Sequence, residues 1–285
     1  MKNILKNKFS LLLKGFIIGS SMSVPGVSGG TMAILLGIYD KLIGAISNFF
    51  KNFKDNFIFL FVFCIGSGIG IGSLAFVIKW LMAAFPLPVS FFFLGAVIGG
   101  IPALYKRTKT SSIGISSVLY FILGLSIVIS IGFIPTGNIQ IGTGSGLAHY
   151  LMLLLTGIII ALALVLPGIS TSHMLLVLGM YDTLLAAITQ FDVIYIGILG
   201  IATLIGVFLI TKPIEWTMNK FPHQTYCMII GFVLGSTFEI FRDKVLPSVP
   251  VEPGVLWGVS TVLLSLGTFI LGCVAIHSLS RFSND

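Results

Sequence analysis

Residues 15–49 read GFIIGSSMSVPGVSGGTMAILLGIYDKLIGAISNF, and residues 157–191 read GIIIALALVLPGISTSHMLLVLGMYDTLLAAITQF. The two stretches align without a gap at an offset of 142 and share 15 of 35 residues, including a Pro-Gly-x-Ser motif and a Tyr-Asp pair. The similarity continues at an offset of 136, where Trp80 coincides with Trp216. Both offsets are about half of the 285 residues, so the sequence indicates an internal duplication.

The composition indicates an integral membrane protein. Apolar residues make up 56% of the chain and charged residues 9%, against about 25% charged in soluble domains. Each half contains a broken apolar segment and then three plain segments of about the 20 residues that a spanning helix needs. The plain segments are 57–78, 88–105, 113–133, 193–211, 223–241 and 255–277. We therefore predict an all-α fold with one transmembrane domain over 1–285, repeat 1 over about 10–134 and repeat 2 over about 148–277.

The broken segment predicts a re-entrant hairpin. Residues 10–49 would form a single helix of about 60 Å, twice the thickness of the hydrocarbon core. Pro25, Gly26, Gly29 and Gly30 interrupt this segment, since proline removes a backbone donor and glycine frees the chain. We expect two helical limbs joined by a turn inside the membrane, where irregular backbone must be buried or line a wet cavity.

The lysines and arginines predict the orientation of each half. Thirteen of the 16 basic residues fall on one side when each hairpin returns to its own side and the plain segments cross; the exceptions are Lys79, Arg242 and Lys244. Each half crosses the membrane three times, and its hairpin adds no crossing. Because the number of crossings is odd, the two repeats are predicted to have inverted topology, as in secondary transporters. Both termini are predicted to be cytoplasmic. The net charge of +7 sits at the ends of apolar segments, which favours contact with membrane lipids over nucleic acid.

The two hairpin tips form the candidate binding site. Each tip opens a helix, so unbonded backbone N–H groups, hydroxyls and the positive end of a helix dipole would meet at the membrane midplane. Such a site suits an anion or a phosphate. Alternatively, the serines and threonines only cap broken helices. The tip residues are Pro25, Gly26, Ser28, Gly29, Gly30 and Thr31 in repeat 1, and Pro167, Gly168, Ser170, Thr171, Ser172 and His173 in repeat 2.

Three residues are candidates for coupling to a proton or to sodium. His173 replaces Thr31 and is the only titratable group at either tip; it either assists the anion or stays neutral against a carbonyl. Asp40 and Asp182 lie about 14 Å beyond the tips along a helix. With the tips at the midplane, each would reach the interface and be an anchor there with its neighbouring tyrosine or part of a proton relay.

Other charged residues and the cysteines receive structural interpretations. Glu239 and Arg242 are one helical turn apart and are expected to form a local pair. The three cysteines lie in apolar segments without metal-ligand spacing, so we predict neither a metal site nor a cofactor. The sequence leaves open whether any of four basic residues reaches a bound phosphate: Lys41, Lys79, Arg107 and Lys212.

The regions SVPGVSGGTMAILLGIYDKLI and LVLPGISTSHMLLVLGMYDTLL resemble the PopT-type polyprenyl-phosphate transporters, a bacterial family, over nearly the whole chain. The resemblance implies a flippase in the bacterial cell membrane that recycles undecaprenyl phosphate, the lipid carrier of peptidoglycan and other cell-wall polymers, from the outer to the cytoplasmic leaflet. It also implies that the two motif regions bind the lipid.

Two alternatives use the same architecture. An ion-coupled transporter of small anions would use the same tips. A polyprenyl-diphosphate phosphatase would need a nucleophile or base together with arginine or metal-binding carboxylates at the phosphate. The tips contain no arginine, lysine or acid, and no glutamate-rich cluster is present, so we predict a transporter and not an enzyme, with no catalytic residues.

Overall fold

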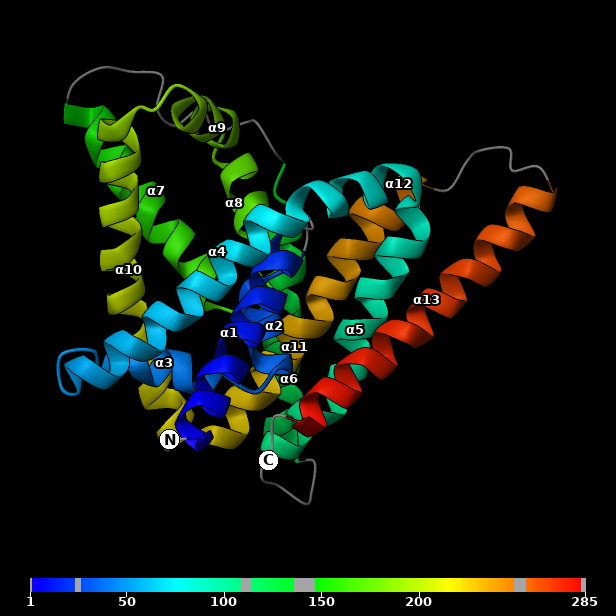
Figure 1. Ribbon diagram of the computed structural model, residues 1–285, viewed down its shortest axis with the longest axis horizontal. Coiled ribbons are helices and arrows are strands. Elements are labelled where there is room, and N and C mark those ends of the chain that lie inside the picture. Colours follow the sequence, from blue (N-terminus) through cyan, green and yellow to red (C-terminus); the bar gives the residue numbers. More distant parts are fainter. Residues whose placement is uncertain (1, 24–26, 109–113, 136–146, 249–254, 283–285) are drawn as a thin grey trace.

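The computed structural model describes residues 2–23, 27–108, 114–135, 147–248 and 255–282, with the backbone alone for 2–7, 147–149, 255–257 and 280–282. Every regular element in these ranges is helical (Figure 1). The elements are α1 Lys2–Met22, α2 Gly29–Leu35, α3 Tyr39–Ser47, α4 Phe53–Ala84, α5 Pro86–Arg107, α6 Ile115–Gly132, α7 Leu147–Val165, α8 Thr171–Val177, α9 Tyr181–Thr189, α10 Val193–Lys220, α11 Pro222–Ile240, a π-helical turn Phe241–Val245, α12 Leu246–Ser248 and α13 Val255–Phe282.

Six helices within the described residues are long and apolar enough to span a membrane, and they coincide with the six predicted plain segments. They differ in how far the protein covers them. In the most apolar window of α5, 56% of the residues are buried, and in that of α11 together with the following turns 61% are buried, whereas the values for α4 and α13 are 11% and 17%. The large side chains exposed on α4, α6, α10 and α13 are therefore suited to lipid, and α5 and α11 form the centre. The chain is a multi-pass membrane protein.

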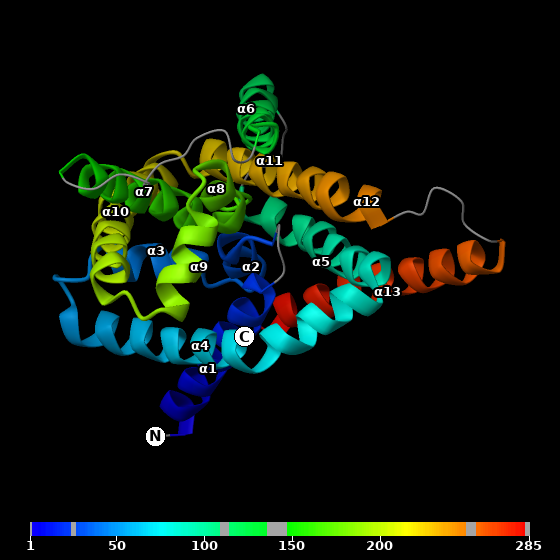
Figure 2. The same cartoon turned by 90° about the horizontal axis from the view of Figure 1, so that it is seen from above.

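The helices pack in the same pairs in both halves. In repeat 1, α1 packs along α4, and in repeat 2, α7 packs along α10. The last helices are exchanged: α13 packs along α5, and α6 packs along α11 (Figure 2). The start of α1 and the end of α13 lie at the same end of the bundle, which we call the terminal end (Figure 1).

Small residues permit the closest of these contacts. A Cβ on Gly66 or Gly70 of α4 would collide with the backbone of α1 at Leu12 or Phe16, while Gly68 and Gly72 have nothing within 4 Å. Residues four apart lie on one face of a helix, which is why Gly66 and Gly70 contact α1 together and the intervening glycine faces elsewhere.

Each hairpin contains a second bend that was not expected from its sequence. The bend is 116° between α2 and α3, and 106° between α8 and α9. Gly37 has a φ of 72°, and α2 ends in a Schellman motif, in which the N–H of Gly37 donates to the Ile34 carbonyl and that of Ile38 to the Ala33 carbonyl. Gly179, with a φ of 65°, ends α8 in the same way. The expectation of one unbroken limb after each tip is wrong, because glycine followed by an apolar residue is a helix stop signal.

Candidate functional site

The two tips meet inside the protein. The Gly168 N–H donates to the Thr31 hydroxyl at 2.8 Å, across 137 residues of sequence, and Thr31 is 1% exposed. A Cβ on Gly30 would lie 3.2 Å from the Cα of Pro167, so the backbones of the two tips are in near contact. Pro25 and Gly26 lie outside the described residues. The tip residues that the structure does describe therefore belong to one place in the molecule.

The first tip contains an unsatisfied hydroxyl. Ser28 occupies the N-cap position of α2, yet its side chain makes no capping hydrogen bond. The residue is 4% exposed, and its hydroxyl oxygen is buried without a hydrogen-bond partner among the described residues. Leaving a buried polar group unpaired costs about 1–3 kcal/mol. Capping therefore does not explain Ser28, and its hydroxyl is available to a ligand.

The second tip differs because its serine does cap a helix. The Ser170 hydroxyl accepts a hydrogen bond from the backbone N–H of His173 at 3.3 Å, at the start of α8. The hydroxyl proton of Ser170 is still free to be donated. Thr171 and Ser172 follow in the first turn, and Ser170 and Ser172 line a cavity of about 70 Å³. Gly168 cannot be replaced easily, because its φ is 82° and a Cβ would strike the Phe232 carbonyl.

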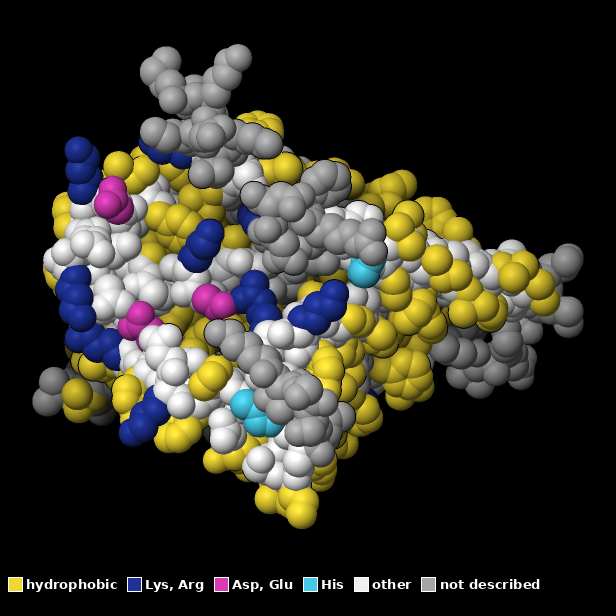
Figure 3. All heavy atoms as spheres, turned by 90° about the horizontal axis from the view of Figure 1, so that it is seen from below, with side chains coloured by type: hydrophobic (Ala, Val, Ile, Leu, Met, Phe, Trp, Pro, Cys, Tyr) yellow, Lys and Arg dark blue, Asp and Glu magenta, His cyan; other side chains and the backbone are white. Residues whose placement is uncertain are grey.

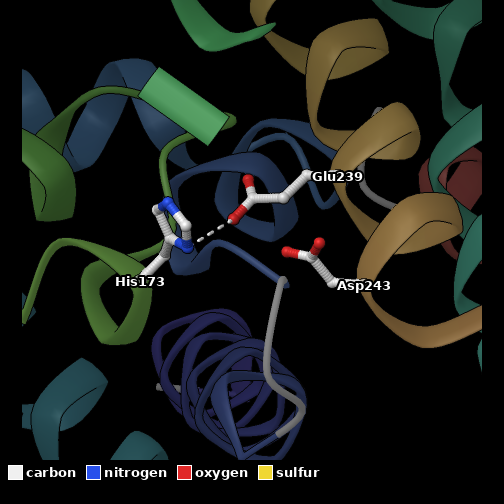
Figure 4. Close-up of side chains that lie close together, drawn as sticks. All are labelled: His173, Glu239 and Asp243. Atoms are coloured by element: carbon white, nitrogen blue, oxygen red, sulfur yellow. Dashed lines mark ion pairs between the residues drawn. The ribbon is translucent and has the colours of Figure 1, made fainter. Parts of the chain in front are cut away.

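His173 faces two carboxylates from α11 and the turn that follows it (Figure 4). Its Nδ1 lies 3.7 Å from Oε1 of Glu239, which is 6% exposed, and its Nε2 lies 3.4 Å from the Ile131 carbonyl. Both ring nitrogens thus face acceptors, and only the doubly protonated ring can donate to both. Asp243 lies in the same cluster, with one ligand atom from each of the three residues within 4.8 Å of the others.

This cluster corrects two expectations. Arg242 pairs with Asp243, through hydrogen bonds of 2.6 and 3.1 Å, whereas Glu239 faces His173; the expected local pair of Glu239 with Arg242 is wrong. Acidic groups therefore do approach the second tip. Glu239 and Asp243 are four residues apart on one helical face, which was the available signal. The donor set could hold a cation, but Arg242 occupies both oxygens of Asp243 and Lys244 lines the same cavity, so the surrounding charge opposes a metal ion.

The other coupling candidates lie away from the tips. Asp40, on α3, pairs with Arg107 at the end of α5, at 2.5 Å. Asp182, on α9, is exposed. Tyr39 is 3% exposed, and its hydroxyl donates to the Val165 carbonyl at 2.9 Å. It is not an interfacial anchor, because the bend at Gly37 turns α3 back into the protein.

A larger cavity of about 430 Å³ lies at the terminal end, between α3, α5, α10 and α11. Lys and Arg side chains gather on this face of the molecule (Figure 3). Of the four basic residues considered from the sequence, Arg107 lines this cavity; Lys41, Lys79 and Lys212 are exposed and line neither cavity. The lining residues are Asp40, Ile43, Lys106, Arg107, Glu215, Met218, Asn219, Pro222 and Tyr226.

The sequence of the chain matches a known protein family. The sequence family described as "undecaprenyl phosphate translocase-like" matches residues 18–253, which include both tips and both cavities. The chain belongs to this family.

Two curated proteins are similar to this chain over most of their length. A protein of Staphylococcus aureus (strain NCTC 8325 / PS 47) named "Polyprenyl-phosphate transporter" is 35% identical over 98% of both chains. A protein of Vibrio cholerae serotype O1 (strain ATCC 39315 / El Tor Inaba N16961) with the same name is 29% identical over 84% of this chain and 79% of its own. No solved structure matches the chain.

Proposed function

We propose that this protein transports a polyprenyl phosphate, undecaprenyl phosphate, from the outer to the cytoplasmic leaflet of the bacterial cell membrane. The carrier would then be reused for peptidoglycan and other cell-wall polymers. The names of both relatives support the substrate class. The substrate joins one phosphate to a long apolar chain, so it requires an anion site inside a bundle whose outer helices expose apolar side chains to lipid.

The buried Ser28 hydroxyl beside the contact between the tips carries the proposal for the site. Without ligand, the Gly168 N–H and the Thr31 hydroxyl satisfy each other. A phosphate entering between the tips would take both donors and add those of Ser28 and Ser170. The helices α2 and α8 have only seven residues each, so these hydrogen bonds, and not a long helix dipole, would provide most of the binding.

The remaining tip residues would shape this site. The glycines and prolines allow the two backbones to approach, and Thr171 and Ser172 add donors from the first turn of α8. We place the phosphate near the midplane, between two inverted repeats with boundaries at about 10–134 and 148–277. The matching helix pairs of the two halves support this arrangement, and the basic face at the terminal end supports cytoplasmic termini.

We further propose that His173 couples transport to the proton gradient. A protonated imidazole would strengthen phosphate capture from the outer side, and loss of the proton to the more alkaline cytoplasm would favour release. Glu239 would hold the ring between loading events, since its carboxylate faces Nδ1 at 3.7 Å. Sodium coupling is the alternative. Asp40 and Asp182 lie away from the tips, and we propose that they position the hairpins instead of carrying the coupled ion.

The test is uptake of labelled undecaprenyl phosphate into proteoliposomes, with and without an inward proton gradient. We expect uptake by the wild type that increases with the gradient, and uptake by His173→Gln that keeps a donor but no longer responds to it. If the glutamine variant retains the gradient dependence, His173 is not the coupling residue. If the wild type transports no polyprenyl phosphate, the proposed function is wrong.

The same preparation separates the two alternatives. A small-anion transporter would accumulate labelled inorganic phosphate and would not be inhibited by undecaprenyl phosphate.

The His173 cluster contains a base and two acids, which is the observation in favour of a phosphatase. A phosphatase would release inorganic phosphate from undecaprenyl diphosphate, and Glu239→Gln would abolish that release; we expect no release.

A further inference from the structure

The larger cavity, at the terminal end of the bundle, contains none of the tip residues. Its volume of about 430 Å³ falls within the range of small-molecule sites. The helices around it come from both halves: α3 and α5 from repeat 1, and α10 and α11 from repeat 2. A site in this position would be shaped by any movement between the halves.

The walls of the cavity carry basic groups whose acidic neighbours already have partners. Glu215 accepts hydrogen bonds from the Ser47 hydroxyl and, at 2.6 Å, from the Asn48 amide, which ties α10 to the end of α3. Asp40 binds Arg107. Lys106, next to Arg107 in the last turn of α5, forms no ion pair within the described part of the chain.

The charge around the cavity is positive. The two basic and two acidic residues in its walls cancel, but further cations lie close by. Lys14 interacts electrostatically with Lys41 and with Arg107. An anion in the cavity would therefore be attracted from outside it as well as from its walls.

The polar and apolar parts of the cavity suit an amphiphilic anion. Tyr226 adds a hydroxyl to the same wall as Asp40 and Arg107. Ile43 and Met218 add apolar surface. Arginine binds phosphate through two parallel N–H donors, and lysine binds it as a point charge. In this structure the Asp40 carboxylate binds the Arg107 guanidinium. A phosphate oxygen could take the place of that carboxylate.

We propose that this cavity is a second binding site, for the phosphate monoester head of the lipid after it leaves the tips, with Lys106 and Arg107 as its ligands. The phosphate replaces Asp40 on Arg107, while Glu215 keeps α3 in place. This inference rests on the proposed function for the identity of the lipid, but not for the phosphate chemistry. It gives the transported head group a stopping point at the terminal end, separate from the site between the tips.

Binding to the purified full-length protein in detergent tests the proposal, with farnesyl phosphate, inorganic phosphate and farnesol as probes. To isolate the cavity from the tips, each variant is made in the Ser28→Ala background. The double variant Lys106→Gln with Arg107→Gln should bind farnesyl phosphate about ten- to a hundredfold more weakly than the background protein, because charge-assisted hydrogen bonds are lost. Asp40→Asn should bind farnesyl phosphate more tightly.

The matched control is Lys51→Gln with Lys54→Gln. It removes two exposed charges that line neither cavity and should leave affinity unchanged.

The outcomes separate the inference from the proposed function. Equal affinity in the background protein and the Lys106/Arg107 variant overturns the second site, even if transport is observed. Loss of affinity in that variant, in a protein that transports no polyprenyl phosphate, supports the phosphate site and rejects the proposed function. Tighter binding of farnesyl phosphate than of inorganic phosphate assigns the site to a lipid head group, while equal binding of the two supports a site for free phosphate. Binding of farnesol as tight as that of farnesyl phosphate overturns the proposal.

Discussion

The helix pairs that follow the two tips, α2–α3 and α8–α9, share their internal bends but not their surroundings. Both helices that follow the tips have seven residues and end at a left-handed glycine. Tyr39 at the start of α3 is nevertheless 3% exposed, and its counterpart Tyr181 at the start of α9 is 39% exposed. The duplicated motif therefore determines the local conformation, and residues outside the motif determine how each hairpin is attached.

One difference outside the motif accounts for the attachment of α3. Glu215 on α10 accepts hydrogen bonds from Ser47 and Asn48 at the end of α3. The position 136 residues earlier, on α4, is Lys79. At the end of α9, the hydroxyl of Thr189 donates to carbonyls of its own helix instead. Two helix pairs with the same internal bend but different anchors are free to respond differently to the same ligand.

The orientation of the hairpins offers the sharpest test of the comparison. Lys51, after α3, and Gln190, after α9, are both exposed. In a background without the three native cysteines, a cysteine at Gln190 should react with an impermeant thiol reagent added to intact cells, and one at Lys51 should react only after permeabilisation. Labelling of both from the same side would contradict the inverted repeat.

Replacing Ser28 or Ser170 by alanine should affect binding and stability in different ways. Ser28→Ala should reduce polyprenyl-phosphate binding about ten- to a hundredfold, the range for losing a hydrogen bond to a charged group, without lowering the melting temperature. Ser170→Ala should reduce binding similarly but also lower the melting temperature, because it removes an N-cap. The double variant should be little worse than either single one, since both donors serve one anion. Ser73→Ala, at an exposed serine of α4, is the control. Independent, additive losses would point to two separate sites.

Glu215→Ala should release α3 from α10. We expect a loss of about 1–3 kcal/mol in the free energy of unfolding, because two donors lose a charged acceptor. Lys79→Ala, at the corresponding position of repeat 1, should change stability by no more than about 0.5 kcal/mol. Denaturant or thermal melts in detergent measure both. Equal effects would mean that Glu215 is not the anchor.

The smallest expected effect is at the two tyrosines. Tyr39→Phe removes a buried hydrogen bond to the Val165 carbonyl and should cost about 1 kcal/mol. Tyr181→Phe should cost nothing measurable, since Tyr181 is exposed. A comparable loss at Tyr181 would show that α9 is buried in solution.

The sequence predicted what depends on local composition and missed what depends on contacts between distant segments. The six spans follow from apolar length, and the helix starts after both tips follow from the Pro-Gly-x-Ser motifs. The bends at Gly37 and Gly179 also have a local signal, a glycine followed by an apolar residue, but a prediction from apolar length does not use it.

The partners of the charged residues could not be predicted from the local sequence. Glu239 faces His173 across 66 residues of chain, so a pairing rule based on adjacent helical turns selected Arg242 instead. Arg107 reaches Asp40 only because the bend turns α3 back towards α5. Neither contact has a periodic signature, and both needed the packed helices to become visible.

The exchange of last helices makes each half of the chain depend on the other. Gly95 and Gly99 of α5 leave no room for a Cβ against α13, and Gly231 of α11 leaves none against α6, so each half supplies the cover for the other half's central helix. A single half would expose that glycine face and could bury it only by associating with a second copy. Neither half is therefore complete by itself, because each supplies the helix that covers the centre of the other. A chain cut between residues 136 and 146 should assemble only when both fragments are made together.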